Sequence, residues 1–251
     1  EKHDRTPLHM ACRNKASVEV INALLSTWPD AAKEKTKNNF TPLHVACKFK
    51  APLAVVSTLL RNWPDAVKEK NTMGETPLYI ACGNGATSNV VFSLLSIWPD
   101  GAKEEASCGN TPLLAACHSG ASIEVTALLL DAWLQEKDNR KVDAWDLDRV
   151  LGLDMTGYAS TLFSYVSAVY NNTADNPSLD EIVKFFISVK MWNGVAFILD
   201  KHPTVVKTMN LGTNVMTDLI SMVGRCCRLT TMWKVICNEQ DLLGGVKIFF
   251  L

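Results

Sequence analysis

The 251-residue sequence contains little that points to a membrane, a secretory route or a metal. No apolar run reaches the ~18 residues that a membrane-spanning helix needs, and no segment has the layout of a signal peptide. The spacing of cysteine and histidine matches no zinc site, and the net charge of −1 identifies no class of partner. We therefore expect a protein that needs no cofactor or metal and does not bind membranes. We place it in the cytoplasm, with the nucleus as the alternative.

The sequence also has few aromatic residues, at 8%, and shows no strand-like alternation of apolar and polar residues. Hydrophobic residues make up 47% of the chain and charged residues 20%, which is enough apolar content to bury a core. This composition excludes a disordered chain, and the missing alternation predicts an all-α fold.

One phrase recurs at a fixed interval. Thr-Pro-Leu begins at Thr6, Thr41, Thr76 and Thr111, so that each start lies 35 residues after the previous one. Self-similarity at this period is typical of a stack of similar units rather than of one closed core. A stack has no built-in pocket, which favours recognition on its surface. Because the chain begins at Glu1, inside the first unit, we expect it to be part of a longer protein.

Each unit contains the signals for a turn followed by a short helix. Residue types that tolerate a left-handed backbone stand two positions before each Thr, at Asp4, Asn39, Gly74 and Gly109. The Thr can then cap a helix whose first residue is Pro. His9 and His44 come three residues after such a Thr. We expect each imidazole to bond the Thr hydroxyl rather than to act as a ligand or a general base.

A second helix follows in each unit and ends near a tryptophan. It begins at Ser17, Pro52, Thr87 and Ser122 and continues through a pair of leucines. The tryptophans that close its apolar face are predicted to lie in the core: Trp28, Trp63, Trp98 and Trp133. A proline follows the first three of them and ends the helix, whereas unit four lacks this proline and should end differently.

Four of the eight cysteines occupy one position of the unit: Cys12, Cys47, Cys82 and Cys117. Equivalent positions of packed helices lie about 10 Å apart, which exceeds the ~7 Å that a disulfide allows between Cα atoms. We therefore predict that these four residues are buried free thiols.

The motifs T-P-L-H-x-A-C, A-S-x-E-V and L-L resemble the ankyrin repeat over about residues 2–135. The Trp-Pro-Asp-Ala extension and the two extra residues resemble a variant found in ankyrin proteins of single-celled algae. Tyr79 and Leu114 depart from the motif, since they replace its His. The resemblance implies a solenoid of helix pairs with fingertip turns. We assign four ankyrin repeats to residues 1–135, a connector to 136–157 and a degenerate, ankyrin-like helical cap to 158–251. Within the cap we expect helices over 158–170, 178–190, 192–201, 213–224 and 228–238.

The resemblance also implies that a partner is met by the fingertip turns and the exposed edge of each first helix. Carried over position by position, that surface consists of Lys2, Arg5, Arg13, Asn14, Lys37, Asn38, Phe40, Lys48, Phe49, Met73, Glu75, Asn84, Asn110 and His118.

Charge is unevenly distributed along this surface. Residues 1–70 contain twelve Lys/Arg and seven Asp/Glu, a balance of +5, whereas residues 71–140 contain three and eight, a balance of −5. Units one and two therefore present a basic groove interleaved with Phe40 and Phe49, for which a merely solvated basic face is the alternative. We expect a monomeric, non-catalytic scaffold that binds an acidic protein segment with apolar anchors. The alternatives are single-stranded nucleic-acid binding and the recognition module of a larger enzyme.

Overall fold

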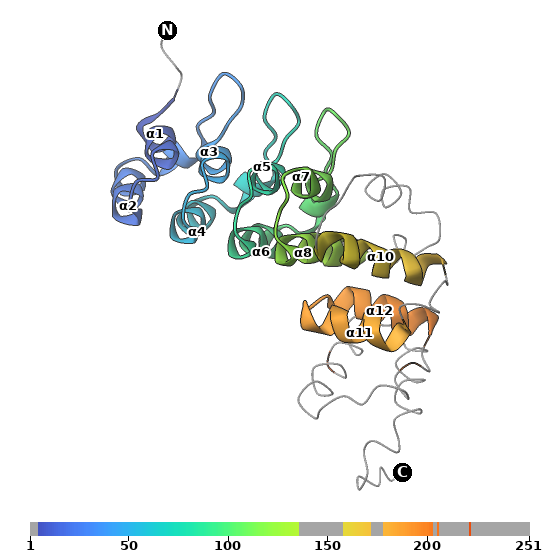
Figure 1. Ribbon diagram of the computed structural model, residues 1–251. Coiled ribbons are helices and arrows are strands. Elements are labelled where there is room, and N and C mark those ends of the chain that lie inside the picture. The colour runs from blue at the N-terminus through green and yellow to red at the C-terminus, as the bar shows by residue number, and fades with distance from the viewer. Residues whose placement is uncertain (1–4, 136–157, 172–177, 203–204, 206–220, 222–251) are drawn as a thin grey trace, which may run out of the picture. The chain divides into compact units, whose positions relative to one another are not determined.

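The structure, a computed structural model, describes residues 5–135, 158–171, 178–202, 205 and 221 (Figure 1). Within these residues it consists of helices and turns and contains no strand, so the predicted all-α fold is confirmed. The described residues divide into two compact units. The first holds the repeats up to Trp133, and the second holds the described residues from Ser160 onward.

The first helices of the four repeats form one row (Figure 1). They are α1 (Pro7–Arg13), α3 (Pro42–Lys48), α5 (Pro77–Gly83) and α7 (Pro112–His118). Each begins with Pro directly after an N-cap Thr, whose hydroxyl oxygen accepts the backbone N–H three residues later. The predicted caps are therefore confirmed. Pro fits the first position because its ring fixes φ near the helical value and it has no N–H to leave unpaired.

The second helices form a parallel row below the first (Figure 1). They are α2 (Val18–Thr27), α4 (Leu53–Asn62), α6 (Ser88–Ile97) and α8 (Ile123–Leu134). A residue with positive φ makes the turn between the two helices of each unit: Lys15, Lys50, Gly85 and Gly120. The 3₁₀ turns η1 (Pro29–Lys33), η2 (Pro64–Lys68) and η3 (Pro99–Lys103) follow the first three pairs. Helix α8 has no such Pro and continues through Trp133, as predicted.

The tryptophan column does not lie in the core, and this prediction was wrong for three of its four members. Trp28 is 44% exposed, Trp63 and Trp98 are half-buried, and only Trp133 is buried. In the first three units the helix ends one residue before the tryptophan, which takes an extended conformation with φ between −140° and −144°. The tryptophan is therefore no longer part of the apolar face of the helix.

Gly101 shows where such a ring lies. A Cβ atom at Gly101 would come within 2.9 Å of Cε3 of Trp98, so the indole packs directly over the backbone of η3. Trp133 differs because it stands inside α8, where its side chain stays on the buried face.

Cysteine burial follows the prediction for three of the four repeats. Cys12, Cys47 and Cys82 are free and buried between adjacent first helices, whereas Cys117 is free but only partly buried. Cys117 stands on α7, which is the last helix in the described row of four first helices and packs within that row against α5. The prediction that all four thiols are buried is therefore wrong for Cys117.

Unit one is less covered than the units after it. Val20 is 47% exposed, whereas Val55, its equivalent in unit two, is 1% exposed. Met10 is exposed as well, and its equivalent Val45 is buried. Each repeat covers the face of the next one, and among the described residues nothing stands before unit one to cover this face.

The second compact unit contains α10 (Tyr158–Asn171) from Ser160 onward, α11 (Leu179–Ser188) and α12 (Trp192–Lys201). The three helices predicted over residues 158–170, 178–190 and 192–201 are therefore present. Lys201 fixes the end of α10, because its ammonium group donates to the carbonyls of Val169 and Tyr170 at 3.0 and 3.1 Å. The predicted connector over 136–157 and the helices predicted over 213–224 and 228–238 lie outside the described residues, apart from the single residue 221.

Candidate functional site

The fingertip turns between repeats are hydrogen-bonded loops of one design. Residues 36–40, 71–75 and 106–110 each close with a bond from the N–H of the first residue to the carbonyl of the last, at 3.0 to 3.1 Å. The predicted left-handed residues make the turn, with φ of 56° at Asn39, 71° at Gly74 and 74° at Gly109. Thr72 N donates to Asn38 O, and Ser107 N donates to Met73 O, so each fingertip is bonded to the one before it.

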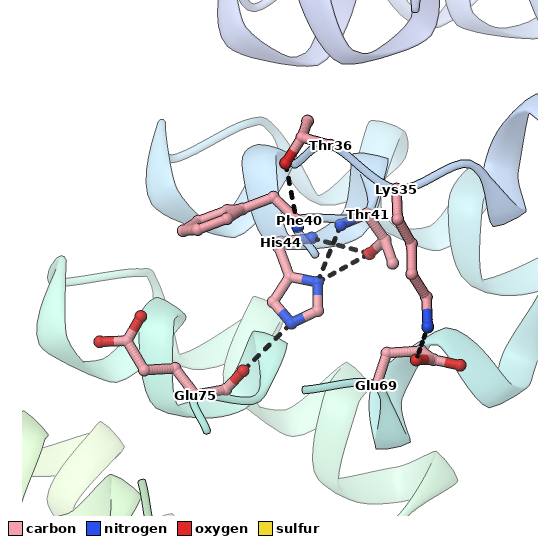
Figure 2. A network of polar contacts seen from close by, with 7 residues as sticks. All are labelled: Lys35, Thr36, Phe40, Thr41, His44, Glu69 and Glu75. Atoms are coloured by element: carbon pink, nitrogen blue, oxygen red, sulfur yellow. Dashed lines mark hydrogen bonds and ion pairs between the residues drawn. The ribbon is translucent and has the colours of Figure 1, made fainter. Parts of the chain in front are cut away.

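His44 ties the first helix of unit two to the next fingertip (Figure 2). The backbone N–H of Thr41 donates to Nδ1 of His44 at 3.2 Å, and the Thr41 hydroxyl lies 2.8 Å from the same atom. Because Nδ1 accepts a hydrogen bond, the ring hydrogen is on Nε2, which donates to the carbonyl of Glu75 at 3.2 Å. Burial lowers the pKa of His44 to about 4, so the ring is neutral near pH 7.

His9 makes the same bonds one repeat earlier, with Nε2 lying 2.9 Å from the carbonyl of Phe40. Burial lowers its pKa as well. The predicted Thr–His bond is therefore confirmed in both units. The structure adds a bond from the imidazole to the following repeat, which explains how a helix of seven residues can position the fingertip beside it.

Ion pairs connect the same junctions on the surface. Lys35 pairs with Glu69 at 2.6 Å (Figure 2), and Lys70 pairs with Glu104 at 2.7 Å. Exposed pairs of this kind each contribute about 0–1 kcal/mol, so the buried imidazoles matter more for the position of the fingertips.

A hollow of about 520 Å³ lies between the fingertips and the first helices of units two to four. Its lining comes from the fingertips and from α3, α5 and α7: Phe40, Lys48, Met73, Glu75, Tyr79, Ile80, Gly83, Asn84, Asn110, Ala115, His118 and Ser119. Seven of the fourteen predicted partner-contacting residues belong to this lining: Phe40, Lys48, Met73, Glu75, Asn84, Asn110 and His118. We call this feature the groove hollow.

Two cations of units one and two are held on aromatic rings, and one of them, Lys48, lines the groove hollow. The ammonium of Lys48 lies 5.1 Å from the ring centroid of Phe40. The guanidinium of Arg13, one repeat earlier, lies 5.6 Å from the ring centroid of Phe49. Such contacts contribute about 0.5–1 kcal/mol at exposed sites and restrict where a long side chain places its charge. The charges of Arg13 and Lys48 are therefore restricted in position by the rings beneath them.

Two polar residues of the lining are already used by the fold. The carboxylate of Glu75 accepts a bond from Nδ2 of Asn71 at 2.7 Å inside its own fingertip. The amide of Asn84 donates to the carbonyl of Ile80 at 2.8 Å at the end of α5. Both groups therefore present a fixed orientation to anything that enters the groove hollow.

The remaining predicted residues do not line the groove hollow. Arg5, Asn14, Lys37 and Asn38 are exposed, Arg13 and Phe49 lie at the ends of α1 and α3, and Lys2 lies outside the described residues.

The predicted set does not include five residues of the lining: Tyr79, Ile80, Gly83, Ala115 and Ser119. Alignment of the repeats could have identified Gly83, because it is the one glycine at the position that Arg13, Lys48 and His118 occupy in the other units.

Among the described residues, no group of three or more His, Cys, Asp or Glu side chains is placed to hold a metal ion. In the same part of the chain, no helix is both long enough and apolar enough to cross a membrane.

Comparison with known families agrees with the geometry of the repeats. Residues 1–67 match the family model described as ankyrin repeats (3 copies). These residues carry ankyrin repeats. No curated protein matches the sequence. Units three and four continue the ankyrin caps, turns and helix pairs beyond the matched residues. Ankyrin repeats are typically non-catalytic modules for interaction between proteins, and stacks of this kind bind on their concave side. The algal likeness of the Trp-Pro-Asp-Ala extension stays a prediction.

Proposed function

We propose that this protein is a non-catalytic interaction module that binds a partner protein along the first helices and fingertips of its four ankyrin repeats. The observation that supports this proposal most directly is the groove hollow. Residues from three consecutive repeats line it, and hydrogen bonds between fingertips hold its upper edge. A binding site built on such a fixed backbone loses little conformational entropy when a partner binds.

The charge of the first two units favours an acidic partner. Arg13 and Lys48 end α1 and α3, are exposed, and lie over the rings of Phe49 and Phe40. Charges at the rim of an interface mainly raise the rate of encounter, whereas aromatic side chains often supply the residues that dominate affinity. We therefore assign the attraction of the partner to the two cations and the lifetime of the complex to the two rings.

Nucleic acid fits this surface less well. Stacking of bases requires open aromatic faces, but each of the two rings already has a cation over it. The carboxylate of Glu75 also lies in the lining, and residues 71–140 carry a balance of −5. A phosphate backbone that continued along the groove would meet this acidic region.

The experiment begins with capture of partners from the source cell on the full chain, followed by mass spectrometry and purification of the partner found. Association and dissociation rates are then measured for the protein and for the double variant Arg13→Glu/Lys48→Glu. We expect slower association with a weaker salt dependence. Phe49→Ala should mainly speed dissociation, with a loss of about 1–2 kcal/mol in affinity.

The matched control is Lys33→Glu/Lys68→Glu. It makes the same change in net charge on the 3₁₀ turns, where each lysine makes only an exposed pair with an aspartate. Binding that stays the same in the groove variants, or that falls equally in the control, would contradict the proposal. Recovery of a nucleic acid in place of a protein would contradict it as well.

A further inference from the structure

The last residue of each first helix faces the same side of the row, and one of the four has no side chain. Arg13, Lys48 and His118 carry long or bulky exposed groups at this position, and unit three has Gly83. Gly83 lines the groove hollow together with its two neighbours in this column, Lys48 and His118. The hollow therefore opens where the column of side chains is interrupted.

Packing does not require a glycine at this place. A Cβ atom at Gly83 would meet only the Cβ of Ala115, at 3.8 Å, which is an ordinary van der Waals distance. The backbone of Gly83 belongs to α5 and is not in the left-handed region. A larger residue would thus fit the fold but would project into the groove hollow and fill it.

Polar and apolar groups contribute about equally to the lining of the groove hollow, and the apolar part includes the residues nearest Gly83 in the repeat. Ile80 and Ala115 are buried and form the base, and half-buried Tyr79 forms one wall. Met73, from the fingertip, is 50% exposed. An exposed methionine beside an aromatic ring and aliphatic groups adapts well to an inserted apolar side chain.

We propose that the groove hollow at Gly83 is a socket for one large apolar side chain, such as Leu, Met or Phe, of an extended acidic partner segment, and that Lys48 binds a carboxylate of that segment. This inference rests on the proposed function and specifies the partner of the same site.

The charged groups around the socket determine where the carboxylate binds. Lys48 brings a positive charge at one end, whereas Glu75 brings a negative charge held in place by Asn71. A partner carboxylate is attracted to the first and repelled by the second. It therefore binds on the unit-two side of the socket, away from the fingertip of unit three.

The spacing of the repeats predicts the spacing in the partner. Lys48 and Gly83 occupy equivalent positions on adjacent packed helices, which lie about 10 Å apart. An extended segment in the polyproline II conformation advances about 3.1 Å per residue and presents the same side every three residues, so the acidic and the apolar residue should be three positions apart. The partner pattern is an acidic residue, two residues of any kind and a large apolar residue, in one or the other chain direction.

The test is a selection of random 12-residue peptides displayed on phage against the full chain. The peptides recovered are synthesised with a fluorescent label, and their dissociation constants are measured by fluorescence polarisation. We expect enrichment of the acidic–apolar pattern with the stated spacing. Gly83→Leu should weaken the binding of these peptides by about tenfold or more, because it fills the socket. Gly83→Ala, the matched control, adds only a Cβ and should change the dissociation constant by no more than about twofold.

Loss of fold cannot explain such a result. Leucine and alanine both have higher helix propensity than glycine, so neither variant should lower the urea midpoint of unfolding. Lys48→Glu separates the two proposals. Peptides that lose affinity with Lys48→Glu but not with Gly83→Leu would overturn the socket and support the groove. Peptide binding that neither Lys48→Glu nor Gly83→Leu changes would overturn the socket and would also contradict the proposed function. A selection that enriches no acidic–apolar pattern would overturn the socket alone.

Discussion

Lowering the pH below 6.5 should destabilise the ankyrin repeats through His44. Its side chain is fully buried, and Nδ1 receives the N–H of Thr41. Protonation would add a hydrogen to Nδ1, where the N–H of Thr41 already points, and would place an uncompensated charge in the core. The folded state therefore holds this ring neutral, and burial is the main cause of its low pKa.

The magnitude follows from the difference in pKa between the two states. The pKa of His44 is about 4 in the folded protein, against 6.5 for an ordinary His. Because the folded pKa is the lower one, the stability that depends on the neutral ring is fully present above pH 6.5. It is lost as the pH falls from 6.5 to 4. At about 1.4 kcal/mol for each unit of pKa, the loss amounts to about 3 kcal/mol.

The assay compares this protein with His44→Leu in urea unfolding followed by circular dichroism between pH 4 and pH 8. Leucine is the residue that unit four has at this position, where Leu114 is buried. At pH 7 the variant should be less stable by about 1–3 kcal/mol, because Thr41 and the Glu75 carbonyl lose their partner. This difference should shrink, and can reverse, by about 3 kcal/mol as the pH falls to 4.

Carboxylates titrate in both proteins, so they cancel in the comparison. If the free energies of unfolding of the two proteins run parallel between pH 4 and pH 7, the ring of His44 is not held neutral by burial and the reasoning fails.

Three further predictions concern the repeats. Cys47, whose pKa burial raises to about 12, should resist a thiol reagent in native protein at pH 8 while exposed Cys108 reacts; equal rates at both would contradict the burial. Leu59→Ala should lower the free energy of unfolding by about 2–5 kcal/mol, and Trp63→Ala should lower it by less because Trp63 is only half-buried. A larger loss for Trp63→Ala in urea titrations would show that Trp63 belongs to the core. Hydrogen exchange should be faster in α1 and α2 than in α3 and α4, because the outer face of unit one is uncovered; equal protection in mass spectrometry would show that this end is not weak.

The sequence allows accurate prediction where the determinants are local. Thr41 caps a helix because its hydroxyl meets an N–H three residues away, and Asn39 turns left-handed because its own side chain tolerates that backbone. Both statements need only a few neighbouring residues. The cross-repeat bond from His44 to the Glu75 carbonyl joins residues 31 positions apart, and only the stacked structure reveals it.

The core position predicted for the tryptophans and the omission of Gly83 from the predicted surface both have geometric causes. Successive helical residues point about 100° apart, so the core position predicted for Trp28 required the helix to continue through it. The helix ends at Thr27, and the ring takes another direction. Gly83 was missed for a different reason, because the property that matters is the space left by an absent side chain. Alignment of the repeats shows that unit three has a glycine where the other units have larger residues. It does not show the volume next to Gly83, because that volume depends on residues from three repeats.

The pair α11–α12 shows how a repeat can keep its geometry after its motif is lost. Met191 N donates to Phe186 O at 2.8 Å across a turn made by Lys190, with φ of 60°. In unit one Ala16 N donates to Ala11 O at 2.9 Å across the turn made by Lys15, with φ of 53°. The exits of the second helices correspond too, since the N–H of the C-cap residue bonds the carbonyl four residues earlier in both pairs.

The start of α11 replaces Thr and His by other residues with the same local function. Ser178 caps the helix, and the carboxylate of Glu181 accepts the N–H of Ser178 at 3.1 Å, as Nδ1 of His9 accepts the N–H of Thr6 at 3.3 Å. A carboxylate can only accept, however, so Glu181 cannot donate to a carbonyl of a following repeat as an imidazole Nε2–H does. The pair thus retains the bonds within a repeat and lacks the one that receives the next repeat. The local geometry of α11 and α12 is thus that of an ankyrin-like helix pair, while the assignment of residues 158–251 to a degenerate cap stays a prediction.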